Sequence, residues 1–130
     1  SMSSSSNNCN VVANVSIATR VDIVCWRGDT FVLTATIADV DGNAVDLSVY
    51  TWKMEVREYD NGPLVILSTN ITITATNLGV LTVTISAANM LVNAGTYVYE
   101  IQATNLTPNP DTVTTYLYGQ FTVTQDITAN

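Results

Sequence analysis

The chain has 130 residues, enough for one domain with a hydrophobic core and too few for two. Its residues are 47% hydrophobic and only 12% charged. The net charge is −7, and only four residues are basic. A phosphate backbone needs clustered Lys and Arg, so we expect no nucleic-acid partner. Apolar residues never run to the roughly 18 needed to cross a bilayer, so we expect no membrane association either.

The first ten residues are interpreted as a polar N-terminal tail. Ser1-Met2 is typical of residues left by cloning, and Ser3 to Asn10 have too little apolar surface to offset the entropy of ordering them. No charged segment precedes an apolar one, so we expect no signal peptide. Residues 11–130 are then a single β-sandwich domain.

Apolar and polar residues alternate with period 2 along most of this domain. In chain order, the alternation predicts strands at 11–17, 21–26, 31–38, 52–57, 64–67, 71–76, 81–85, 96–103 and 116–123. Turn residues such as Asp41-Gly42 and Asn61-Gly62 separate them, and only residues 87–92 have helical character. We therefore predict an all-β fold, an antiparallel immunoglobulin-like β-sandwich of about seven to nine strands.

The segment Gly95-Thr96-Tyr97 has the pattern of a tyrosine corner, a loop and glycine followed by a tyrosine at the start of a strand. The hydroxyl of Tyr97 is expected to bond back across the loop at 87–93. The inward-facing positions of the predicted strands should form the core, which includes Trp52, Met54, Leu81, Val83, Tyr99, Ile101 and Phe121.

The two cysteines leave two interpretations open. Cys9 and Cys25 form a disulfide, or Cys25 is a small buried hydrophobe and Cys9 an incidental thiol. The position of Cys9 in a polar segment favours the second.

Catalytic equipment is sparse. The chain has no histidine, which removes His-based acid–base catalysis, Ser-His triads and most zinc sites. It also has no phosphate-binding loop of the Walker or dinucleotide type. Glu55 and Glu100 lie on the polar faces of predicted strands, which favours solvated side chains over a carboxylate pair for glycoside hydrolysis. We expect no enzymatic activity and no cofactor.

Two short motifs have both a functional and a structural interpretation. Oxygen ligands gather at Asp39, Asp41, Asn43 and Asp46, as calcium prefers, but the glycine is misplaced for an EF-hand, so a plain hairpin is favoured and we expect no metal. Arg27-Gly28-Asp29 is the tripeptide that integrins bind, but it is better explained as a turn before a strand.

Aromatic residues supply the candidate contact surface. Tyr116 and Tyr118 share one face of the last predicted strand and are expected to be exposed, with Tyr59 as a third contact residue. Together with Tyr50 and Trp26 they would form an aromatic platform for a surface glycan. The alternative, burial against a neighbouring subunit, is favoured because few charges guard the strand edges, so we expect a homo-oligomer.

Several short segments occur along the chain in a characteristic order. These segments are Gly28 to Phe31, Asp41-Gly42 with Asp46-Leu47, Val56-Arg57, Gly95 to Glu100, Tyr116 to Gly119 and Asp126 to Thr128. In this order the chain resembles, over about residues 23 to 128, the small β-sandwich domains of tailed-phage tail, baseplate and fibre proteins.

The resemblance implies a non-enzymatic structural or adaptor subunit of a virion. Such a subunit is synthesised in the host cytoplasm and binds other virion proteins, typically as a symmetric homo-oligomer. Two alternatives stay open, a carbohydrate- or receptor-binding β-sandwich module and a bacterial surface immunoglobulin-like domain.

Overall fold

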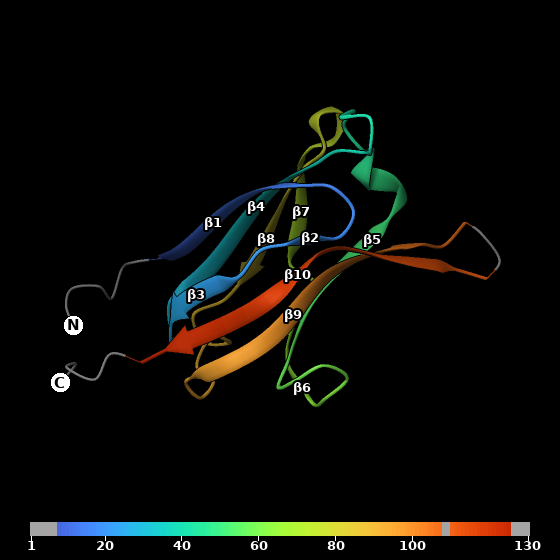
Figure 1. Cartoon of the computed structure of the whole chain (residues 1–130). Helices are drawn as coiled ribbons and strands as arrows, with labels where there is room; N and C mark the ends of the chain where they lie inside the picture. Colours follow the sequence, from blue (N-terminus) through green and yellow to red (C-terminus); the bar gives the residue numbers. More distant parts are fainter. Residues whose placement is uncertain (1–7, 108–109, 126–130) are drawn as a thin grey trace.

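The computed structural model describes residues 8–107 and 110–125. These residues form ten strands in two sheets that pack face to face (Figure 1). Two short 3-10 turns connect strands. The first, η2 (Leu47–Val49), links the two sheets, and the second, η3 (Thr76–Leu78), lies within a hairpin. The predicted all-β fold is confirmed. The structure has one strand more than the largest number expected, and the additional strand is β2, whose two residues are too few to show an alternation. Within the described residues no helix is long and apolar enough to span a bilayer.

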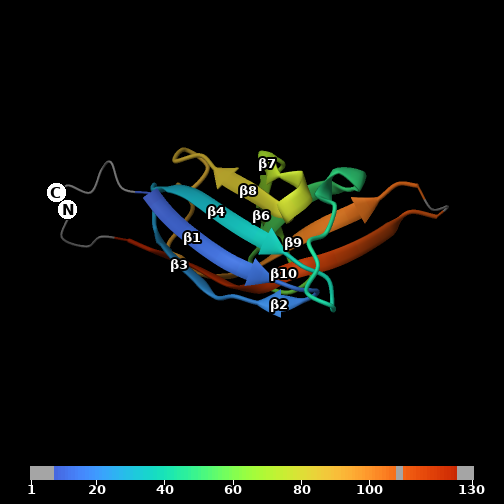
Figure 2. The same cartoon turned by 90° about the horizontal axis from the view of Figure 1, so that it is seen from above.

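The first sheet has four strands in the order β1 (Asn8–Val15), β4 (Thr30–Ile37), β8 (Val80–Ile85) and β7 (Ile71–Ala75). β8 runs antiparallel to both of its neighbours. β1 runs parallel to β4 along its whole length, beside it in Figure 2.

The second sheet has six strands. β10 (Thr112–Thr124), β9 (Gly95–Asn105), β5 (Thr51–Arg57) and β6 (Leu64–Ser68) follow one another as antiparallel neighbours. β2 (Thr19–Arg20) and β3 (Ile23–Trp26) both pair with the far side of β10, and both run parallel to it. The hairpin of β9 and β10 continues beyond the sheet as a projecting two-stranded arm, at the right of Figure 1.

The prediction of a purely antiparallel sandwich is therefore wrong, because β1, β2 and β3 make parallel pairs. Period-2 alternation fixes which side chains face the core, but it says nothing of the direction of the neighbouring strand. The tail prediction also fails for residues 8–10, which belong to β1. Asn8 and Asn10 point outward while Cys9 between them is half-buried, so these residues continue the alternation. Residues 1–7 lie outside the described part of the chain.

The core lies between the sheets. All seven residues expected there are buried, and the rings of Phe31 in β4 and Phe121 in β10 meet across the interface with centroids 5.4 Å apart. The predicted tyrosine-corner bond is also present, since the Tyr97 hydroxyl donates to the Asn93 carbonyl.

A disulfide joins Cys9 of β1 to Cys25 of β3, with their Cα atoms 5.6 Å apart. The favoured interpretation of Cys9 as an incidental thiol is therefore wrong. Sequence reasoning placed this residue in a tail, whereas β1 carries it to the edge of the four-stranded sheet, directly opposite β3. The bond ties one sheet to the other at this edge.

Candidate functional site

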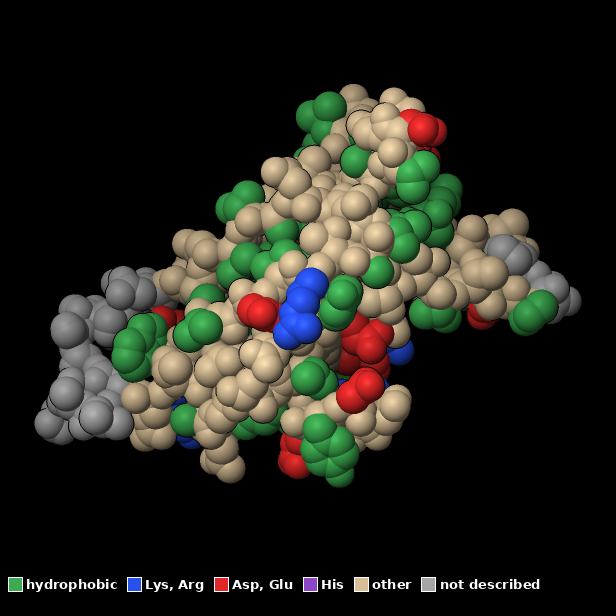
Figure 3. Space-filling model, viewed as in Figure 1, with side chains coloured by type: hydrophobic (Ala, Val, Ile, Leu, Met, Phe, Trp, Pro, Cys, Tyr) green, Lys and Arg blue, Asp and Glu red, His purple; other side chains and the backbone are tan. Residues whose placement is uncertain are grey.

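Charge divides the molecule into two different faces. Every charged residue that lies in one of the described strands belongs to the six-stranded sheet, and these are Arg20, Lys53, Glu55, Arg57 and Glu100. Figure 3 shows acidic and basic side chains gathered over β9, β10 and the turn between β5 and β6. The four-stranded sheet contains no charged residue in its strands as described.

The charged face contains a hollow of about 350 Å³. Its floor is formed by β9 and β10, and its walls by β2, β5 and the β5–β6 turn. The lining residues are Arg20, Glu55, Arg57, Asp60, Asn61, Val98, Tyr99, Glu100, Tyr118, Gly119 and Gln120. The hollow is mixed in charge, with two arginines and three carboxylates.

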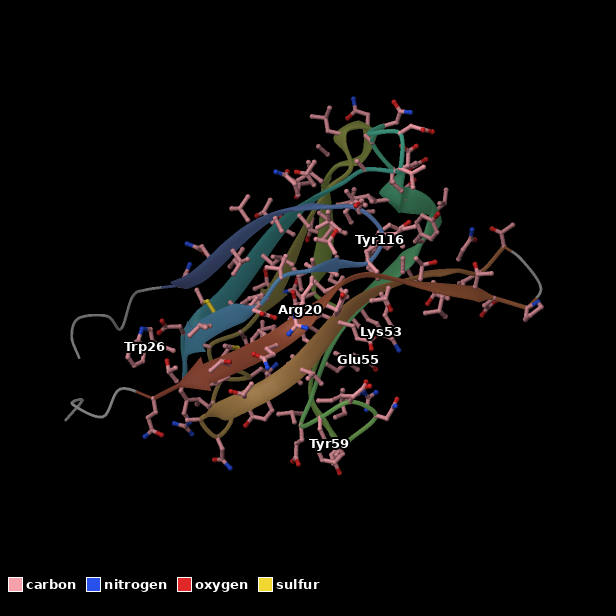
Figure 4. The ribbon with its side chains drawn as sticks, viewed as in Figure 1. Arg20, Trp26, Lys53, Glu55, Tyr59 and Tyr116 are labelled. Atoms are coloured by element: carbon pink, nitrogen blue, oxygen red, sulfur yellow. A yellow bond between two sulfur atoms is a disulfide. The ribbon has the colours of Figure 1, made fainter. Side chains whose placement is uncertain are left out.

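One wall is held by ion pairs along β5. Glu55 lies 3.4 Å from the Lys53 ammonium and 3.3 Å from the Arg57 guanidinium, and its side chain is only 13% exposed. Figure 4 shows Lys53 and Glu55 close together on this face. Arg57 also donates to the Gly62 carbonyl at 2.9 Å, which fixes the β5–β6 turn. The expectation of a freely solvated Glu55 is therefore wrong, because its ion-pair partners flank it on the same strand and cover it.

Glu100 faces Glu55 across the pairing of β5 and β9. The Thr115 hydroxyl donates to its Oε1 atom at 3.1 Å, and the Gln102 amide donates to the same oxygen. The two carboxylates that the sequence offered as a possible pair are thus direct cross-strand neighbours, and this pairing depends on the register of strands distant in sequence.

The opposite wall of the hollow depends on the close approach of the Val21 backbone to Gly119 of β10. A Cβ atom there would collide with the Val21 carbonyl oxygen, and φ is +155°. The same carbonyl accepts from the buried Tyr99 hydroxyl at 2.6 Å. This contact draws the 20–22 segment against β10, and the burial that accompanies it raises the pKa of Tyr99.

Asp22 completes this wall. Its Oδ1 atom accepts from the Gln120 backbone N–H at 2.9 Å and from Arg20 Nε at 3.1 Å. These two interactions, the backbone bond first, hold the pKa of Asp22 below its ordinary value. Arg20 is thereby positioned at the rim of the hollow, where Figure 4 shows it on the outer face of β10.

The candidate contact tyrosines separate into different environments. Tyr118 lines the hollow and is 39% exposed, and Tyr59 is 60% exposed on the neighbouring β5–β6 turn. Tyr116 is buried, with its ring 5.3 Å from that of Trp52. The expectation of an exposed Tyr116 is wrong because a β-bulge between Thr115 and Leu117 shifts the alternation at that point.

Burial, assisted by the neighbouring Tyr50, raises the pKa of Tyr116 to about 12. Tyr50 packs against Trp52 in the same cluster, and Trp26 is exposed at the other end of the sheet (Figure 4). The single aromatic platform, which was the less favoured of the two interpretations of these residues, is therefore not formed.

The carboxylates of the candidate calcium ligands Asp39 and Asp46 accept hydrogen bonds from nearby backbone N–H groups instead of converging on one point. The Asp39 carboxylate accepts the N–H groups of Asp41 and Asn43, both at 2.9 Å, inside the hairpin turn. Asp46 caps η2 by accepting from Ser48, which keeps the pKa of Asp46 below its ordinary value. In residues 8–107 and 110–125 no group of three or more Cys, Asp or Glu is arranged to hold a metal ion.

The Arg27-Gly28-Asp29 segment forms the turn that was predicted before β4. Gly28 adopts φ +85° and donates its N–H to the Met90 carbonyl, while the N–H of Asp29 reaches the Trp26 carbonyl. The Arg27 side chain donates to the Val92 carbonyl at 2.9 Å. The motif is explained by its role in joining β3 to β4.

Comparison with known proteins supports the fold. No protein-family model matches the sequence, and no curated protein matches it. Among solved structures, the chain is similar to the "N-terminal domain of phage TP901-1 ORF48", with a TM-score of 0.57 and 9% sequence identity over 87% of this chain and 98% of that one. At this identity the likeness shows a shared fold. The predicted resemblance to a phage β-domain is confirmed at that level.

Proposed function

We propose that the protein is a non-enzymatic structural subunit of a tailed-phage particle, in the tail, baseplate or fibre, where it acts as an adaptor through protein–protein contacts. The observation that carries the proposal is the fold likeness to a phage protein domain over nearly the full length of both chains. The ordered signals between residues 23 and 128 support it independently. On this proposal the protein is made in the host cytoplasm and becomes part of the virion.

We also infer that the sandwich is immunoglobulin-like. The order β4-β8-β7 corresponds to strands B, E and D of that fold, and β5-β9-β10 corresponds to C, F and G. The Tyr97 bond at the start of β9 has the position of the tyrosine corner. The parallel β1 is a departure from the antiparallel first strand of that pattern.

The docking surface we propose is the outer face of the four-stranded sheet. A row of small side chains crosses it in register, from Val12, which is 81% exposed, through Thr34 and Thr82 to Thr72. Because these strands carry no charge, covering the face requires no ion to lose its water. The centres of protein interfaces are depleted of charge for the same reason. The face suits a second copy of the chain or another virion protein.

The edges of this sheet support the same proposal. β1 and β7 are its outer strands, and neither contains the lysine that usually protects an open edge. A neighbouring subunit that covered the face would also shield these edges.

Light scattering on the full chain tests this surface. We expect concentration-dependent self-association, and Thr34→Lys should abolish it by placing a charge at the centre of the row. Thr122→Lys is the matched control, because Thr122 lies on β10 of the other sheet and is partly exposed. If the wild type is monomeric at high concentration, homo-oligomerisation is wrong. If both variants change association equally, the four-stranded face is the wrong surface.

A further inference from the structure

We propose that the hollow on the six-stranded sheet binds a neutral saccharide. The site lies on the opposite sheet from the proposed docking face, and it does not depend on the function proposed above. Its volume of about 350 Å³ falls at the small end of ligand pockets, at a size suited to a mono- or disaccharide.

The lining matches the hydrogen-bonding chemistry of sugar hydroxyl groups. Each hydroxyl both donates and accepts, so a sugar needs donors and acceptors side by side. Arg20 and Arg57 offer donors, Glu100 and Asp60 offer acceptors, and Gln120 offers both.

Acceptor capacity remains at the centre of the hollow. Both hydrogen bonds described for the Glu100 side chain end on Oε1, which leaves Oε2 to accept from a ligand. The ion pairs in the described part of the chain involve Glu55 and Asp22 but neither Glu100 nor Asp60. Two carboxylates are thus available beside two arginines.

Tyr118 supplies the apolar element of the site. Its ring lines the hollow and is 39% exposed, enough to present an aromatic surface to the C–H face of a pyranose. Leu117 and Phe121 on either side of this part of β10 are buried, so the strand that carries Tyr118 is fixed.

The walls of the hollow are formed before any ligand binds. Asp22 bonds the Gln120 backbone and Arg20 on one side, and Arg57 bonds the β5–β6 turn at Gly62 on the other. Positions fixed in this way lower the entropy that binding must offset.

The mixed charge favours a neutral ligand. A cationic or an anionic group placed in the hollow meets charges of its own sign as well as charges of the opposite sign, since two arginines and three carboxylates line it. A neutral polyhydroxylated ligand avoids this repulsion, and this is why we favour a saccharide over a protein side chain.

Amide chemical-shift mapping by NMR tests the site with a panel of D-glucose, D-galactose, N-acetyl-D-glucosamine, L-rhamnose and lactose. At least one sugar should shift the amides of residues 98–100 and 118–120, with a Kd on the order of 1 mM. Tyr118→Ala should weaken that binding at least about tenfold, by loss of ring contact. Glu100→Gln should also weaken binding at least about tenfold, and because it keeps the size of the side chain it serves as the folded variant if Tyr118→Ala does not fold. Trp26→Ala, which removes another exposed aromatic residue away from the hollow, should leave binding unchanged.

Two results would overturn the proposal. One is the absence of shifts at these residues with every sugar up to about 100 mM, far above the expected Kd. The other is a response of the same amides to N-acetyl-arginine methylamide but to none of the sugars, which would make the hollow a pocket for a protein side chain. Neither result bears on self-association through the four-stranded sheet, so the two proposals fail separately.

Discussion

The disulfide between β1 and β3 should contribute a large part of the stability of this domain. The two cysteines are 16 residues apart, and the bond closes the segment that carries the chain from one sheet to the other. In the chain-entropy account, closing a loop of this length in the unfolded state is worth about 3 kcal/mol at 25 °C. Because domains are stable by only about 5–15 kcal/mol, this one bond should be a substantial fraction of the total.

Urea unfolding, followed by tryptophan fluorescence, measures this contribution. The oxidised protein is compared with the same protein in a reducing agent and with the Cys9→Ala/Cys25→Ala double variant. The reduced form keeps both side chains, so it isolates the cross-link. The double variant also removes a buried sulfur at Cys25 and should be somewhat less stable than the reduced form.

We expect the free energy of unfolding to fall by about 3 kcal/mol on reduction, with a lower urea midpoint. Intact-mass measurement should show that the oxidised protein lacks two hydrogens and has no free thiol. If reduction leaves the midpoint unchanged, or if both thiols react in the native protein, the placement of β1 against β3 is wrong.

Four further predictions concern the core, a close approach, the alkaline limit and the hairpin at 39–46. Trp52→Ala should cost about 3–5 kcal/mol in urea unfolding, and a loss below 1 kcal/mol would show that the residue is not in the core. Gly119→Ala should lower the melting temperature measured by calorimetry because its Cβ has no room, whereas Gly95→Ala, where a Cβ meets open space, should be nearly neutral. Tyr116 has a pKa raised from 10.0 to about 12, so below pH 10 it contributes no pH dependence, and between pH 10 and 12 the unfolded state ionises first and stability falls. Tyr116→Phe should make that fall less steep, and an unchanged slope in pH-dependent unfolding would contradict the burial of the hydroxyl. Millimolar calcium should leave the melting temperature unchanged, because the hairpin carboxylates already bind backbone N–H groups, and a clear rise would revive the metal site.

Local signals in the sequence were sufficient for most of the strands and for the core. Trp52, Met54 and Val56 alternate with charged residues, and the structure buries all three while leaving the charges on the outer face. The Tyr97 bond followed from the same kind of local reasoning. These features depend on side-chain period and turn residues, which neighbouring positions encode.

Features that depend on contacts distant in sequence escaped prediction. The parallel pairing of β1 with β4 and the disulfide to Cys25 both require knowing where residues 8–15 lie in space. Tyr116 was misplaced because one extra residue in a bulge reverses the alternation there.

The hollow escaped prediction for the same reason. It collects side chains from β2, β5, β9 and β10, whose positions in the chain span about a hundred residues, and no local motif marks it. Two signals were nevertheless present in the sequence. Gly119 interrupts the apolar face of the last strand, and Lys53, Glu55 and Arg57 occupy successive outward positions.

The central claim, that the protein is a structural component of a phage particle, is tested most directly by quantitative mass spectrometry of phage particles purified from lysates of the bacterium that carries the gene. We predict that the protein is present in intact particles at a fixed ratio to the tail proteins, in a copy number that fits a symmetric ring or fibre. Its absence from purified particles, together with its recovery from the surface of uninfected cells, would contradict the account and favour a bacterial surface domain.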